Sequence, residues 1–168
     1  MTTVALIGAP GSGKSTVGPL VAERLGVGFV DVDTWLEQRE GRRVAEIFAT
    51  DGEAAFRALE RDATLALLRE PGVVSLGGGA PLTEAVARAL ASAVVVWLQV
   101  DARHALPRIG VDDTSVIRAP VGLRGRLIKL LAERTPVYRR LATHTVDTSG
   151  REPDALADEI VGLLGWAQ

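Results

Sequence analysis

Nine consecutive residues near the start of the chain have the composition of a phosphate-binding loop. Residues 8–16 are Gly-Ala-Pro-Gly-Ser-Gly-Lys-Ser-Thr, a complete match to the pattern G-x-x-x-x-G-K-[ST]. Glycines allow backbone N–H groups to curl around phosphate oxygens, and the start of a following helix adds partial positive charge. An empty glycine-rich turn is the alternative. The complete match between an apolar run and a helical pattern favours a nucleoside triphosphate site.

The side chains of this loop have separate tasks. The pattern assigns Lys14 to the β- and γ-phosphates and the Ser15 hydroxyl to Mg²⁺. The other loop residues that we expect at the triphosphate are Gly11, Ser12, Gly13 and Thr16.

Two aspartates end the predicted second strand, residues 29–33. Because side chains alternate along a strand, Asp31 and Asp33 would point to the same face, near the phosphate loop. One carboxylate would act on Mg²⁺ through water, and the other would orient an attacking hydroxyl. The alternative is that Asp33 caps the next helix, a role that is compatible with catalysis.

Two further patterns leave their alternatives open. Arg57 and Glu60 are one turn apart on a predicted helix, and this spacing alone favours a solvated surface pair. Residues 77–79 are three glycines at the end of a predicted strand. They would either expose backbone N–H groups to a small ligand or form a tight, empty turn.

Arginines recur between residues 108 and 140. An arginine above a transferring phosphoryl group stabilises the charge on its oxygens, and spacing does not choose among four candidates. These candidates are Arg108, Arg118, Arg124 and Arg126. Another arginine near Pro136, if it points inward, would bind a carboxylate through two hydrogen bonds. That second group is Arg134, Arg139 and Arg140.

Strands that alternate with helices must position these residues. The apolar runs predict strands at residues 4–8, 29–33, 73–76, 93–98 and 144–147. This alternation is typical of an α/β fold with a parallel sheet covered on both faces, with binding residues at the carboxyl ends of the strands.

Prolines and one long connection set the expected boundaries of several helices. We expect Pro19 to kink the helix at residues 14–25. We expect the helix at residues 126–134 to end before Pro136, with a further turn or two at residues 136–143. Pro153 would begin a last helix that extends to Trp166. Residues 110–125 are long for a connection in a compact domain, and such loops are often lids over active sites.

Composition limits the classes of function. The 168 residues predict one domain, 1–168, and 47% of them are apolar. The chain has no cysteine and a net charge of −2, so disulfides and thiolate sites are excluded and nucleic acid is not an expected partner. No export signal and no apolar run of about 18 residues is apparent. We therefore expect a cytoplasmic protein without a membrane partner.

Taken together, these segments resemble the shikimate kinase family over nearly the whole chain. The residues that carry the resemblance are 8–16, 31–33, 37–39, 47–53, 56–57, 60, 75–79 and 134–140. The resemblance implies a three-layer α/β/α P-loop fold with a parallel sheet in the order 2-3-1-4-5 and a lid at about residues 110–125. It also implies transfer of the ATP γ-phosphate to the 3-hydroxyl of shikimate, with Mg²⁺ as cofactor, by a monomer of the aromatic amino acid pathway.

The resemblance also implies roles for residues at the acceptor. Asp33 would contact the ring hydroxyls and orient the nucleophile. Arg57 and Arg134 would bind the carboxylate, and Glu60 would hold Arg57 in place. Backbone contacts would come from Gly78 and Gly79.

At the nucleotide, the resemblance makes Ser15 a Mg²⁺ ligand and lets Asp31 act on the metal through water. Lys14 and the lid residue Arg118 would act with Asp33 in catalysis. The residues that flank adenine would be Arg108, Arg151 and Pro153.

The predicted lid departs from the family pattern. Family members usually carry Arg-Pro-Leu-Leu, whereas residues 118–121 of this chain are Arg-Ala-Pro-Val. Two alternatives accompany the leading hypothesis, and the first of them would fit the altered lid. One is a related kinase of another cyclitol or sugar acid, and the other is a nucleotide-binding regulator without catalytic activity.

Overall fold

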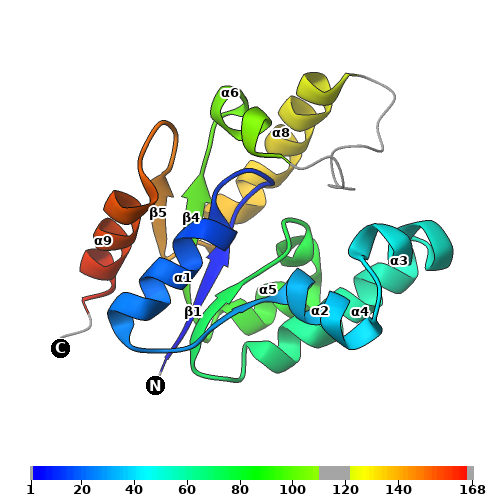
Figure 1. The fold of residues 1–168 in the computed structure, drawn as a ribbon, viewed down its shortest axis with the longest axis horizontal. Coiled ribbons are helices and arrows are strands. Elements are labelled where there is room, and N and C mark those ends of the chain that lie inside the picture. Colours follow the sequence, from blue (N-terminus) through cyan, green and yellow to red (C-terminus); the bar gives the residue numbers. More distant parts are fainter. Residues whose placement is uncertain (1, 110–121, 166–168) are drawn as a thin grey trace.

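A five-stranded parallel sheet forms the centre of the computed structural model, which describes residues 2–109 and 122–165 (Figure 1). Its strands are β1 (Thr3–Ile7), β2 (Phe29–Asp31), β3 (Gly72–Ser75), β4 (Val94–Gln99) and β5 (His144–Asp147). Neighbouring strands are parallel, and their order is β2-β3-β1-β4-β5. The predicted fold class and strand order are confirmed.

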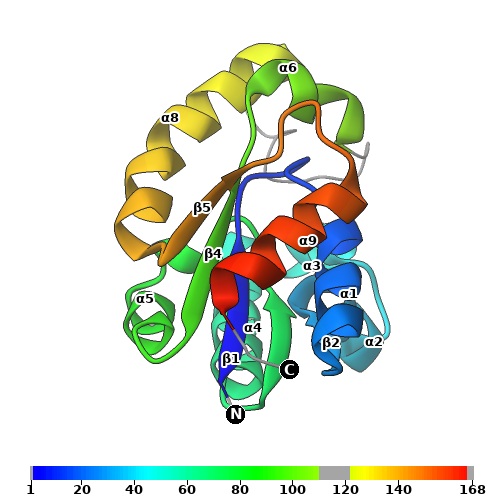
Figure 2. The same cartoon turned by 90° about the vertical axis from the view of Figure 1, so that its left-hand side faces the viewer.

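Helices cover both faces of this sheet. They are α1 (Lys14–Leu25), α2 (Val32–Glu40), α3 (Val44–Asp51), α4 (Glu53–Leu67), α5 (Glu84–Leu90), α6 (Ala102–Ala105), α8 (Leu123–Leu141) and α9 (Pro153–Leu164), with short 3₁₀ helices at η1 (Ala80–Leu82) and η2 (Leu106–Arg108). Figure 2 shows α1 and α9 on one side of the sheet and α5 and α8 on the other. None of the helices within residues 2–109 and 122–165 is long and apolar enough to cross a bilayer.

The alternation of side chains along β1 explains the two layers of helices. Val4 and Leu6 lie in a core that includes residues of α1 and α9. Ala5 and Ile7 point the other way, into a core that includes residues of α4, α5 and α8. All four side chains are fully buried, which is typical of a parallel strand covered on both faces.

Proline does not end either helix in which it lies. Helix α1 continues past Pro19 to Leu25, where Gly26 in the left-handed conformation ends it. Helix α8 runs from Leu123 to Leu141 through Pro136, so the predicted break at this proline is wrong. The buried residues of α8 recur at intervals of three and four, so they form one continuous buried stripe along the helix. Packing of this stripe outweighs the loss of one backbone hydrogen bond.

The second strand is shorter than predicted. It ends at Asp31, and Val32 already begins α2. The predicted lid at residues 110–125 lies mostly outside the described residues, and so does Arg118. Helix α8 begins at Leu123, inside the predicted lid, and α9 ends at Leu164, two residues before the predicted end.

Candidate active site

The phosphate-binding loop connects β1 to α1 through three glycines with positive φ. These angles are +156° at Gly8, +78° at Gly11 and +94° at Gly13, and Gly13 caps α1. The loop also packs closely: a Cβ on Gly8 would lie 2.7 Å from the Leu98 carbonyl oxygen, and one on Gly11 would lie 2.5 Å from that of Ala105. Conformation and space therefore both require glycine in the loop.

Lys14 extends back along the loop that precedes it. Its Nζ donates to the carbonyl oxygens of Gly8 at 2.6 Å and Ala9 at 3.2 Å, and to the Ser12 hydroxyl at 3.3 Å. These bonds hold the ammonium group against the residues of the phosphate-binding loop. A cation fixed there is suited to phosphate oxygens.

Ser15 and Asp31 meet beside the loop. The Ser15 hydroxyl donates to Asp31 Oδ2 at 3.2 Å, while Asp31 Oδ1 accepts from the Thr34 N–H at 3.0 Å. Asp31 is therefore the N-cap of α2, and the predicted alternative of a cap at Asp33 is wrong. The early helix start also removes the strand alternation that was predicted to align the two carboxylates.

These two residues suit a magnesium ion. Mg²⁺ prefers oxygen donors, and in kinases it takes one or two protein ligands besides phosphates and water. Ser15 and Asp31 offer a hydroxyl and a carboxylate that are adjacent in space. No cluster of three or more His, Cys, Asp or Glu side chains that could hold a metal occurs in the described part of the chain.

One cavity of about 440 Å³ joins the phosphate loop to the ends of β2 and β3. Its lining includes Asp33 in the first turn of α2, and Arg57 and Glu60 of α4. The predicted residues that line it are Gly11, Ser12, Gly13, Lys14, Ser15, Thr16, Asp31, Asp33, Arg57, Glu60, Gly78, Gly79 and Arg108. The structure thus brings most of the predicted site residues together.

Arg57 and Glu60 form an ion pair at the edge of this cavity. Arg57 Nη1 lies 2.8 Å from Glu60 Oε1, and the Glu60 side chain is only 3% exposed. Burial raises the pKa of Glu60, and the positive charges of Arg57 and Arg134 partly oppose this effect. The solvated surface pair that spacing favoured is therefore wrong, because α4 turns this face toward the site.

Each glycine of the triple glycine makes space for a charged side chain. A Cβ on Gly77 would lie 2.6 Å from Glu60 Oε2, one on Gly78 2.7 Å from Arg134 Nη1, and one on Gly79 2.5 Å from Arg57 Nη1. None of these glycines has a positive φ. The glycines are required here by the close approach of charged side chains, whereas the close approach that the sequence predicted was that of a small ligand.

Arg134 comes to the site from α8, on the far side of the triple glycine. It is 7% exposed, and its Nη1 atom is buried without a hydrogen-bond acceptor among the described residues. One turn later, the Tyr138 hydroxyl donates to the Gly78 carbonyl oxygen at 2.6 Å, and burial raises the pKa of this hydroxyl. Tyr138 thereby fixes α8 against the glycines. Arg134 lines a second cavity that shares Arg57 and Gly79 with the first.

Sequence reasoning assigned no role to an aromatic pair under Arg57. The rings of Phe48 and Phe56 lie 4.6 Å apart, and the Arg57 guanidinium is 5.9 Å and 5.5 Å from them. Such distances are favourable for cation–π contacts, which help to orient the guanidinium. Both phenylalanines lie in segments that carry the family resemblance, and this was their signal in the sequence.

A second missed residue, Glu37, fixes the turn between α2 and α3. Its Oε2 atom accepts from the Val44 N–H at 3.0 Å, and both residues line the cavity. Arg43, between them, also lines the cavity. A capping contact across a turn has no strong sequence signature, although Glu37 carried part of the family resemblance.

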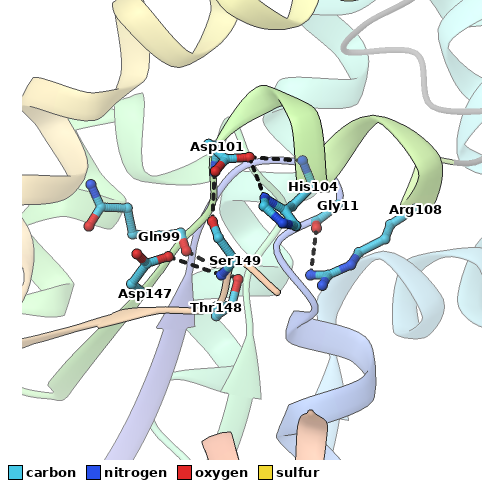
Figure 3. Close-up of polar contacts among 8 residues, drawn as sticks. All are labelled: Gly11, Gln99, Asp101, His104, Arg108, Asp147, Thr148 and Ser149. Atoms are coloured by element: carbon cyan, nitrogen blue, oxygen red, sulfur yellow. Dashed lines mark hydrogen bonds and ion pairs between the residues drawn. The ribbon is translucent and has the colours of Figure 1, made fainter. Parts of the chain in front are cut away.

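The predicted nucleotide residues beyond the phosphate loop do not all line the cavity. Arg108 does, and its Nη1 is 3.5 Å from the Gly11 carbonyl oxygen, a long hydrogen bond (Figure 3). Arg151 instead binds Glu159 and the Asp147 carbonyl oxygen. Pro153 begins α9 as predicted.

Comparisons with known proteins agree on one family. The sequence model described as shikimate kinase matches residues 10–164. The shikimate kinases of Mycobacterium avium and Thermobifida fusca are each 49% identical over 160 residues, which cover 95% of this chain and 91% and 92% of theirs. A shikimate kinase from Acinetobacter baumannii, solved in complex with shikimate, has a TM-score of 0.92 at 30% identity and covers 98% of this chain and 93% of its own.

Proposed function

The chain belongs to the shikimate kinase family and phosphorylates shikimate with ATP, and we propose how its residues divide this reaction. The observation that carries the assignment is the cavity that joins the phosphate loop to Asp33, Arg57 and the triple glycine. A nucleotide site and a site for a small hydroxylated acid are adjacent in it. The alternatives of another acid acceptor or a silent regulator have no support from the comparisons.

The phosphate loop would hold the ATP triphosphate. Backbone N–H groups of residues 11–16 surround the phosphates, and Lys14 neutralises charge on the β- and γ-phosphates. Ser15 would bind Mg²⁺ directly, and Asp31 would do so through water. The ion supplies charge neutralisation to the transferring phosphoryl group. We keep the lid assignment of Arg118 as a prediction.

The acceptor would be held by charge and shape. Arg57 and Arg134 approach the triple glycine from α4 and α8, so a carboxylate between them would receive hydrogen bonds from both guanidinium groups. The buried Nη1 of Arg134, which has no acceptor among the described residues, supports this role. Gly78 and Gly79 would add backbone contacts to the ring.

Asp33 would then act on the reacting hydroxyl. The 3-hydroxyl oxygen forms a bond to the γ-phosphorus while the bond to the β,γ-bridging oxygen breaks, ADP leaves, and Asp33 accepts the hydroxyl proton. The main contribution of the protein is positioning together with electrostatic stabilisation, as in other phosphoryl transfers. The expected monomeric state stays a prediction.

An assay of ADP release tests this proposal. Purified protein with ATP, Mg²⁺ and shikimate is compared with the same mixture containing quinate or gluconate. We expect turnover with shikimate and little with the other acids. Turnover with another acid but none with shikimate would contradict the acceptor, and no turnover with any acid would contradict the kinase assignment. Omission of Mg²⁺ from the assay tests whether turnover requires the metal ion, and we expect turnover to be lost.

A further inference from the structure

The proposed function fixes the side of the phosphate loop on which the nucleoside lies. The acceptor residues Asp33 and Gly77–Gly79 follow β2 and β3, which are on one side of β1. In phosphoryl transfer the attacking and leaving oxygens are roughly in line with the phosphorus, so ADP leaves on the opposite side. The nucleoside must therefore extend toward the carboxyl ends of β4 and β5.

Asp101 and His104 form a polar pair just after the carboxyl end of β4. Asp101 is the N-cap of α6, and its Oδ1 accepts from the His104 N–H at 2.8 Å and pairs with the His104 ring Nδ1 at 2.7 Å. Figure 3 shows the aspartate and the imidazole side by side above the phosphate loop. One carboxylate thus fixes both the start of α6 and the orientation of the ring.

The backbone of the same residue connects α6 to the loop after β5. The Asp101 N–H donates to the Ser149 hydroxyl at 3.1 Å. Two residues earlier, the Gln99 carbonyl oxygen accepts from the N–H and the hydroxyl of Thr148, at 2.8 Å and 3.1 Å. These bonds lie across the gap between the two strand ends, so the loops after β4 and β5 are held as one unit (Figure 3).

This unit contacts the phosphate loop, and it leaves little space for a side chain at positions 11 and 150. A Cβ on Gly150 would lie 3.3 Å from His104 Nε2, so the imidazole covers this glycine, which has a φ of +68°. On the other side of α6, the Ala105 carbonyl oxygen leaves space only for a glycine at position 11. Displacement of α6 would therefore reshape the region between Gly11 and Gly150.

We propose that Asp101 and His104 are positioning residues for the nucleoside half of ATP, acting through Gly150 and through α6, which the backbone N–H of residue 101 joins to Ser149. The inference rests on the proposed function, because in-line transfer places the nucleoside at this end of the sheet. The two side chains are 55% and 35% exposed, so their contact adds little to global stability. A loss of nucleotide affinity can thus be separated from unfolding.

The test measures nucleotide and phosphate binding separately in Asp101→Ala, His104→Ala and Ser149→Ala. Calorimetric titration with Mg·ADP reports the whole nucleotide, and titration with Mg·tripolyphosphate reports the phosphate loop alone. Asp101→Ala removes a helix cap and the link to His104, and we expect Kd for ADP and KM for ATP to rise about five- to tenfold. KM for shikimate and Kd for tripolyphosphate should change by less than about twofold.

Matched variants separate a loss of the Asp101 contacts from an unspecific effect of substitution. Asp101→Asn keeps a carbonyl oxygen that accepts from His104 and should restore most of the ADP affinity. Glu84→Ala removes an acid from the first turn of α5, paired there with Arg88, and should leave every constant unchanged. Thermal unfolding shows whether each variant is folded. If Asp101→Ala does not fold, Ser149→Ala provides a smaller perturbation of the same region.

Two results overturn the proposal. One is unchanged ADP affinity in folded Asp101→Ala and His104→Ala. The other is an equal loss of ADP and tripolyphosphate affinity, which would show that the pair acts on the phosphate loop. If the wild-type protein does not phosphorylate shikimate, the proposed function fails, whereas the two titrations still decide the role of the pair at the nucleotide.

Discussion

Two glycine-rich segments flank the proposed reaction site, and they use glycine for different reasons. Gly8, Gly11 and Gly13 all have positive φ angles, whereas none of residues 77–79 does. In the phosphate loop, glycine gives the backbone a shape that directs N–H groups toward a ligand, and at Gly8 and Gly11 it also leaves space for backbone oxygens. In the triple glycine, the missing Cβ atoms leave space for carboxylate and guanidinium groups.

This difference divides the site into a backbone half and a side-chain half. The nucleotide half depends on the curvature of the loop, held by close packing against β4 and α6. The acceptor half depends on charged groups of α2, α4 and α8 that converge on the glycines. Substitutions should therefore change nucleotide binding together with stability in the first half, and acceptor constants with little loss of stability in the second.

The largest effect should come from Asp33→Asn in the side-chain half. Without a carboxylate to accept the hydroxyl proton, kcat should fall about a hundredfold or more. Kd for Mg·ADP should stay the same, because the phosphate loop is untouched. Steady-state kinetics and calorimetry measure the two constants. Near-normal turnover in this variant would remove Asp33 from the reaction.

Arg134→Ala should mainly weaken acceptor binding. Loss of a charge-assisted contact to a carboxylate is expected to raise KM for shikimate about ten- to a hundredfold, with a smaller change in kcat. Arg140→Ala is the matched control, since this arginine is exposed on the same helix. If both variants show the same KM, the proposed carboxylate contact is wrong.

The comparison is sharpest in the pair Gly11→Ala and Gly79→Ala. At Gly11 the new Cβ meets backbone and the φ is +78°, so strain of about 1–3 kcal/mol should lower the free energy of unfolding and impair ADP binding. At Gly79 it meets only the end of the Arg57 side chain, which can move. Here KM for shikimate should rise about tenfold with nearly unchanged stability. Urea unfolding and kinetics report both quantities.

An equal loss of stability in the two glycine variants would contradict the division into halves. So would a Gly79→Ala variant with a normal KM for shikimate, because Arg57 would then tolerate displacement. Gly52→Ala serves as a conformational control: its φ is +90°, and a Cβ there would meet nothing within 4 Å.

The backbone half was predictable from the sequence, and the side-chain half was predictable only in part. The phosphate loop is a local pattern in which spacing determines shape, so residues 8–16 were sufficient. Arg57 and Glu60 share a helix face by spacing, but the packing of α3, α4 and the triple glycine determines whether that face is buried. Local rules do not contain this information, and only the family resemblance indicated that Glu60 holds Arg57.

The boundaries of helices and strands were also only partly predictable from local sequence rules. A shift of two residues at the end of β2 made Asp31 the helix cap and placed Asp33 in the first turn of α2. At Pro136, local propensity predicted a break, but the buried stripe of α8 carried the helix through to Tyr138. At Asp31 the contact that marks the boundary is local, the hydrogen bond from the Thr34 N–H, whereas at Pro136 packing against residues distant in sequence outweighed the local preference.

The smallest effect that we expect concerns stability as a function of pH. Burial raises the pKa of Glu60 above its ordinary value of 4.5, so above that pH the folded chain binds more protons at this carboxyl than the unfolded chain does. The free energy of unfolding contributed by Glu60 must therefore fall as the pH rises from 4.5 through the raised pKa. Glu60→Gln removes this dependence, while it weakens the hold on Arg57 and raises KM for shikimate. Urea unfolding between pH 4.5 and 7 should show the wild type losing stability relative to the variant; parallel curves would mean that Arg57 and Arg134 fully offset the burial.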